Sequence, residues 1–146
     1  MKESYLEIRK RTKFMKAESE RLWELINRHT NGSKWQFNMV TNGVFPEPEC
    51  EYPYILIDFS VKPQPGRKEG FDNYCIELTE DEIKSNHRLI KILTEGRNLK
   101  ASPIGCSGED KDFEPGFLVY KITIDDYSKI KGVSFSWWEK LIAFFK

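Results

Sequence analysis

Residues 52–63 read YPYILIDFSVKP, and their hydrophobicity alternates with a period of two. The apolar set is Ile55, Ile57, Phe59 and Val61. The alternate set is mixed and consists of Tyr54, Leu56, Asp58, Ser60 and Lys62. This pattern is typical of a β-strand with one buried face. Pro53 and Pro63 favour extended backbone and limit the strand at its two ends. The apolar row therefore needs a second layer to pack against, and the mixed row presents polar groups on the other face.

Length and charge place the chain among single globular domains. Its 146 residues, 39% of them hydrophobic, are enough to form one core, and we expect a single domain over residues 1–146. Lys and Arg number 23, and Asp and Glu also number 23. No net charge therefore attracts the whole protein to nucleic acid or to an anionic membrane, and any such affinity must be local.

The cysteines and the first residues bear on the cellular location. Cys50, Cys75 and Cys106 are an odd number at wide spacing, which predicts neither a disulfide framework nor a zinc site. Residues 1–13 are rich in charge and lack the apolar run of a signal peptide, and no later apolar run approaches the length of a membrane span. We therefore expect a reduced, cytoplasmic protein.

Three capping-box patterns predict three helix starts, at residues 4–7, 79–82 and 136–139. Apolar residues at helical spacing extend the first helix to Asn31-Gly32 and the second to Gly96, and the third runs to the end of the chain.

Further strands are predicted around residues 35–39, 73–78 and 118–124, which alternate as 52–63 does. Residues 97–116 are rich in Gly and Pro without periodicity, and they predict a long loop. The sequence thus predicts an α+β domain with a mainly antiparallel four-stranded sheet, helices packed on one face, and the element order α-β-β-β-α-β-α.

The mixed face of the sheet gives one candidate site. In a tight hairpin Asp58 and Glu77 would be diagonal neighbours, with their backbones roughly 7–8 Å apart, so that their carboxylates could share a divalent cation. The order helix, three strands, helix, strand resembles the core of PD-(D/E)xK nucleases, which implies a divalent metal held by two acids, with a lysine nearby. Thr79 stands two residues after Glu77, where that motif has Lys. Lys62 or Lys121 would have to take its place.

The first helix offers a second candidate site. Its side away from the apolar stripe carries Arg9, Lys13 and Lys16, which could contact nucleic-acid phosphates. Glutamates are interspersed along the same helix, and a solvated surface of mixed charge is the favoured interpretation of the pattern.

The last helix offers a third candidate site. We predict that Trp137, Leu141 and Phe144 pack on the core, and that Trp138, Ile142 and Phe145 stay exposed as a partner-binding patch.

No complete catalytic set and no Gly-rich phosphate loop appear in the sequence, and we predict no cofactor. The favoured interpretation is a small cytoplasmic protein-binding protein of the inhibitor, immunity or adaptor type, without catalytic activity. The alternatives are a divergent metal-dependent nuclease using Asp58 and Glu77, and a nucleic-acid-binding protein using the first helix. The sequence leaves the partner and the oligomeric state open.

Overall fold

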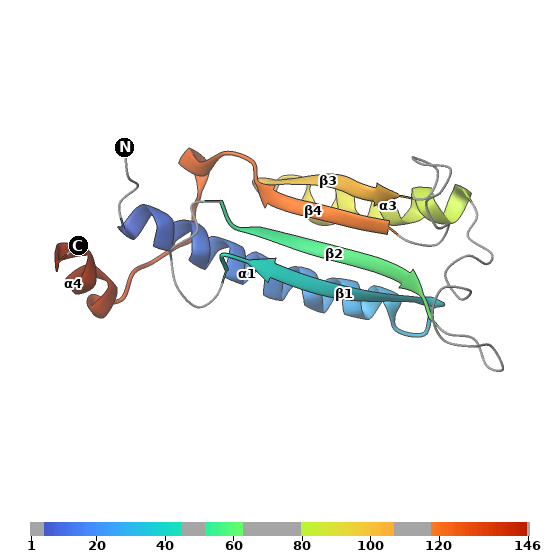
Figure 1. Cartoon of the computed structure of the whole chain (residues 1–146), viewed down its shortest axis with the longest axis horizontal. Coiled ribbons are helices and arrows are strands. Elements are labelled where there is room, and N and C mark those ends of the chain that lie inside the picture. The colour runs from blue at the N-terminus through green and yellow to red at the C-terminus, as the bar shows by residue number, and fades with distance from the viewer. Residues whose placement is uncertain (1–4, 45–51, 63–79, 107–117, 146) are drawn as a thin grey trace.

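The computed structural model describes residues 5–44, 52–62, 80–106 and 118–145 (Figure 1). Its elements are α1 (Tyr5–Thr30), β1 (Trp35–Asn42), β2 (Tyr54–Val61), α3 (Glu80–Thr94), β3 (Leu99–Cys106), β4 (Leu118–Ile124), the short 3₁₀ helix η1 (Tyr127–Lys129) and α4 (Trp137–Phe145).

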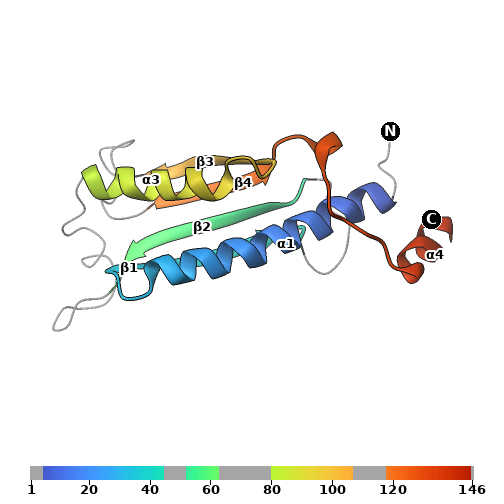
Figure 2. The same ribbon diagram turned by 180° about the vertical axis from the view of Figure 1, so that it is seen from behind.

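The four strands form one antiparallel sheet in the order β1-β2-β4-β3. Helices α1 and α3 lie on the same face, with α1 along the β1 side and α3 along the β3 side, as the view from behind shows (Figure 2). The predicted α+β class with an antiparallel sheet covered on one face is therefore confirmed, but the described elements follow the order α-β-β-α-β-β-η-α and not the predicted α-β-β-β-α-β-α.

The core lies between this face and the two helices. Ile55, Ile57 and Phe59 of β2 are fully buried, as their alternation predicts. The ring of Phe59 contacts Tyr120 of β4 edge to face, with the ring centroids 6.0 Å apart. Side chains buried from the other elements include Met15, Leu22, Ile26, Ile90 and Ile122. The central strand is thus buried on its apolar side, while Tyr54, Leu56 and Asp58 on its other side remain partly exposed.

The prediction of a loop over residues 97–116 is wrong in its first part, because β3 occupies Leu99–Cys106. β3 is an edge strand, so Pro103 costs no ladder bond that the fold requires. A register shift between Pro103 and Gly105 also interrupts the alternation. Because of these two features, the sequence of β3 lacks the alternation of apolar and polar residues that predicts a strand. The strand predicted at residues 73–78 lies outside the described residues.

Phe59→Ala is expected to lower the free energy of unfolding by about 3–5 kcal/mol, because it leaves a cavity against the Tyr120 ring. Urea unfolding followed by circular dichroism measures this. Val40→Ala, at an exposed position on the uncovered face, is the control and should change stability by less than about 0.5 kcal/mol. Equal effects of the two substitutions would contradict this description of the core.

Candidate functional site

Helix α4 begins with the capping box that the sequence predicts. The backbone N–H of Ser136 donates to Oε1 of Glu139 at 2.8 Å. The backbone N–H of Glu139 donates to Oγ of Ser136 at 3.2 Å. This reciprocal pair fixes where the helix starts and therefore which way each of its side chains points.

Glu139 also attaches α4 to α1. Nε of Arg9 donates to its Oε2 at 2.7 Å, and Nζ of Lys13 donates to its Oε1. Lys13 additionally donates to the backbone oxygen of Ser134 at 2.6 Å. Only 8% of the Glu139 surface is exposed. The described contacts that hold α4 beside the N-terminal part of α1 are thus largely ionic, and α4 extends beyond the end of the sheet (Figure 1).

The environment of Glu139 keeps its carboxylate charged. Burial by itself raises the pKa of this group, but the hydrogen bonds from Lys13, the Ser136 amide and Arg9 outweigh burial and lower the pKa from 4.5 to about 2. The attachment therefore carries its full charge throughout the neutral pH range.

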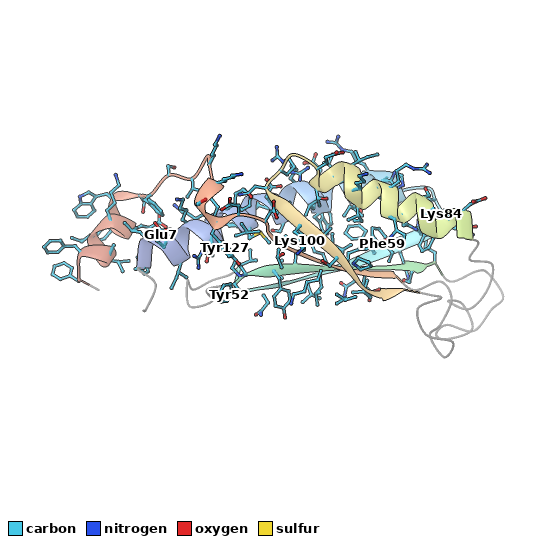
Figure 3. The ribbon with its side chains drawn as sticks, turned by 90° about the horizontal axis from the view of Figure 1, so that it is seen from above. Glu7, Tyr52, Phe59, Lys84, Lys100 and Tyr127 are labelled. Atoms are coloured by element: carbon cyan, nitrogen blue, oxygen red, sulfur yellow. The ribbon has the colours of Figure 1, made fainter. Side chains whose placement is uncertain are left out.

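The opposite side of α4 is apolar and faces solvent. At 100° per residue its large apolar side chains cover an arc of roughly 160°, with Glu139 on the other side of the helix. The exposed fractions are 66% for Trp137, 66% for Trp138, 40% for Ile142, 83% for Phe144 and 77% for Phe145. We call these five residues the α4 aromatic face. Its rings pack in neighbouring pairs, with centroids 4.8 Å apart for the tryptophans and 5.3 Å apart for the phenylalanines. Side chains at this end of the molecule extend away from its body (Figure 3).

The sequence prediction for α4 is confirmed in part. Trp138, Ile142 and Phe145 are exposed as expected. The expectation that Trp137 and Phe144 pack on the core is wrong, because α4 is attached through Glu139 and lies beyond the end of the sheet. The sequence predicts Glu139 as part of the capping box, but its ion pairs with Arg9 and Lys13 were missed, because nothing near Glu139 in the chain indicates them.

The basic side of α1 is partly used inside the molecule. Arg9 and Lys13 both bind Glu139, whereas Lys16 is exposed. Two of the three side chains proposed for nucleic-acid contact therefore already neutralise a buried carboxylate.

The proposed acidic site on the sheet is only partly visible. Asp58 lies on the uncovered face between Asn38 of β1 and Val119 of β4. Its Oδ1 is buried and has no hydrogen-bond partner among the described residues, and burial raises the pKa of this carboxyl group from 3.8 to about 6. Glu77 lies outside the described residues, and the described residues contain no cluster of three or more His, Cys, Asp or Glu suited to a metal ion.

The two lysines proposed to assist Asp58 make other contacts. Nζ of Lys62 donates to the backbone oxygens of Ser33 at 2.8 Å and Thr30 at 3.2 Å. Nζ of Lys121 lies 4.6 Å from the centroid of the Tyr54 ring, a cation–π contact. Asp58 is thus a polar site without an assembled catalytic group around it in the described part of the chain.

Glu139→Gln is expected to loosen α4 from α1 by about 2–3 kcal/mol, because it removes the charge from a buried ionic contact while the amide preserves the capping box. Faster amide hydrogen exchange in residues 137–145, with exchange in β2 unchanged, would report this. Because the pKa is lowered by folding, the wild-type attachment should also weaken as the pH falls from 4.5 towards 2, and the variant should lack this dependence.

The matched control is Glu24→Gln, which breaks an exposed pair with Arg28 four residues away on α1. Its effect should stay below about 0.5 kcal/mol. Unchanged exchange of α4 in the Glu139 variant would show that other contacts hold the helix.

Asp58→Asn is expected to stabilise the protein by about 1 kcal/mol at pH 8, because a partly exposed carboxylate with a raised pKa is costly only when it is charged. The folded wild type keeps a proton between pH 4 and 6 that the unfolded chain releases, so its stability should fall as the pH rises through this window. Urea unfolding at several pH values tests both points. A less stable variant at pH 8 would mean that the charged carboxylate has a favourable partner.

No described helix combines the length and hydrophobicity needed to cross a membrane. Comparisons with protein-family models, curated proteins and solved structures found no match to this chain.

Proposed function

We propose that this chain is a cytoplasmic protein-binding protein of the inhibitor, immunity or adaptor type, without catalytic activity, and that it contacts its partner through the α4 aromatic face. The observation that carries the proposal is the orientation of α4. Its polar side is turned to the protein's own α1 and its aromatic side to solvent. A helix that serves only its own core has the reverse arrangement.

The composition of this face supports a protein partner. Trp is among the residues enriched at binding hot spots, and large apolar side chains lose water most favourably in a closely fitting pocket. The five residues lie on one short helix that Glu139 holds against α1, so little conformational freedom is lost when they bind. The cytoplasmic location is supported by the three widely spaced cysteines, which predict no disulfide framework.

A second candidate function is the divergent metal-dependent nuclease. It is favoured by Oδ1 of Asp58, which is buried and accepts no hydrogen bond from the residues that the structure describes. It predicts that millimolar Mg²⁺ or Mn²⁺ raises the thermal unfolding temperature, and that Asp58→Asn abolishes this rise. No change in either protein would count against it.

The proposed function is tested by affinity capture from a lysate of the native cells, using wild type and the double variant Trp138→Ala, Phe145→Ala. Ile92→Ala serves as the control, since Ile92 is an exposed apolar residue on α3, away from α4. A specific partner should be retained by wild type and by the control, and its affinity for the double variant should fall at least about tenfold.

Equal capture by all three proteins would remove α4 as the binding surface. Binding of wild type to phosphatidylserine vesicles, lost in the double variant and without any protein captured, would instead identify a lipid surface as the ligand.

A further inference from the structure

The two edges of the sheet differ in their protection against pairing with another strand. The β3 edge carries Lys100, Pro103 and a bulge, all of which discourage edge pairing. The β1 edge reads WQFNMVTN, with no charged residue and no proline. Its register with β2 is uninterrupted from Trp35 to Asn42. Among the described strands β1 pairs only with β2, and it forms one border of the sheet (Figure 1).

The free edge presents backbone groups in a defined pattern. The N–H of Lys62 donates to the carbonyl oxygen of Lys34 at 2.7 Å, which makes these two residues a hydrogen-bonded pair at the end of the β1–β2 ladder. Such pairs alternate along antiparallel strands. The even-numbered residues of β1 therefore turn their N–H and C=O towards β2. The odd-numbered residues turn theirs to the free edge, and these are Trp35, Phe37, Met39 and Thr41.

An apolar groove lies beside the middle of this edge. It is lined by Ser19, Glu20, Trp23 and Glu24 of α1 and by Met39 of β1. Trp23 is 52% exposed, and its ring lies 6.2 Å from that of Phe37, centroid to centroid. Backbone groups of β1 that pair with no other described strand thus lie beside exposed apolar surface.

We propose that β1 pairs antiparallel with β1 of a second copy of this chain, about a two-fold axis at Asn38. Residues directly opposite each other must lie on the same face of a sheet, so the axis passes through a residue. At Asn38 the axis sets Trp35 against Thr41 of the second copy, and Phe37 against Met39 of the second copy. The four residues whose backbone groups point to the free edge then all form hydrogen bonds with the second copy, about eight bonds in total. The two sheets become one continuous sheet.

The sequence of β1 suits pairing with a second copy of itself, because a two-fold axis at Asn38 brings together the equivalent residues nearest the axis. A charged residue there would meet a like charge, and β1 has none. The same axis brings the two grooves together, so that each half-exposed Trp23 gains cover.

The acidic rim of the groove opposes this association. The Glu24 carboxylate is compensated by Arg28. The main repulsion near the axis is therefore between Glu20 of one copy and Glu20 of the other. Removal of the Glu20 charge should therefore tighten the dimer, because it relieves the repulsion between the two copies. Non-specific association does not predict this dependence on one residue.

Analytical ultracentrifugation of the full chain is the first test. Wild type at about 50 μM should sediment with twice the 17.2 kDa of one chain. Thr41→Pro deletes an N–H that faces the free edge and none that faces β2, so it should weaken the dimer at least tenfold while the circular dichroism spectrum is retained. Glu20→Gln should strengthen the dimer several-fold.

A cross-linking test does not depend on the proline variant folding. In a background with Cys50, Cys75 and Cys106 replaced by Ser, Asn38→Cys should form a disulfide-linked dimer on mild oxidation, because the two residues face each other across the axis. Gln36→Cys should not, since its equivalent lies several residues away along the strand.

A wild-type chain that stays monomeric at about 100 μM overturns the proposal. So does a dimer that forms no Asn38→Cys cross-link. The double variant Trp138→Ala, Phe145→Ala should leave the dimer intact. Loss of the dimer in that variant, with no response to Thr41→Pro, would instead place self-association on α4. Failure of this proposal is therefore separable from failure of the proposed function.

Discussion

The constraint on which the structure depends is that, among the described residues, α1 and α3 cover the same face of the sheet. The alternation in β2 places Ile55, Ile57 and Phe59 under α1 and α3, and it leaves Asp58 on the other side. Since α1 and α3 lie on the same face, the opposite face, the β1 edge and α4 lie outside the core of the described residues. Asp58, the proposed dimer edge and the α4 aromatic face lie in these three places, whereas Arg9, Lys13 and Lys16 lie on α1.

Asp58 shows the energetic cost of placing a carboxylate on the sheet face opposite α1 and α3. Its neighbours across the sheet are Asn38 and Val119, and one of its oxygens is buried with no hydrogen-bond partner in the described part of the chain. Burial raises its pKa to about 6, so the charged form is disfavoured by folding. Glu139 is also buried, yet its pKa is lowered to about 2, because Lys13, Ser136 and Arg9 donate to it. The difference between the two carboxylates is the supply of hydrogen-bond donors, which decides whether the pKa of the buried group is raised or lowered.

The sequence was sufficient for features that depend on local patterns. The period-two rows found β1, β2 and β4, and the capping box at Ser136 found the start of α4. It was insufficient for β3, where Pro103 and the bulge remove the pattern at an edge that can tolerate them. It also failed for the orientation of α4, because the partners of Glu139 lie about 130 residues earlier in the chain and nothing local announces them. The ion pairs of Glu139 with Arg9 and Lys13 orient α4, although the apolar pattern of this helix favoured packing on the core.

The two proposed surfaces are compatible in space. Thr12 of α1 donates to the carbonyl oxygen of Gly43, so the N-terminal part of α1, where α4 is attached, lies near the C-terminal end of β1. An antiparallel pair about Asn38 directs these ends of the two copies away from each other. The two α4 aromatic faces would then stand at opposite ends of the dimer, both open to solvent. Such an arrangement is bivalent, and a partner with two suitably spaced sites would bind more tightly than either contact alone allows.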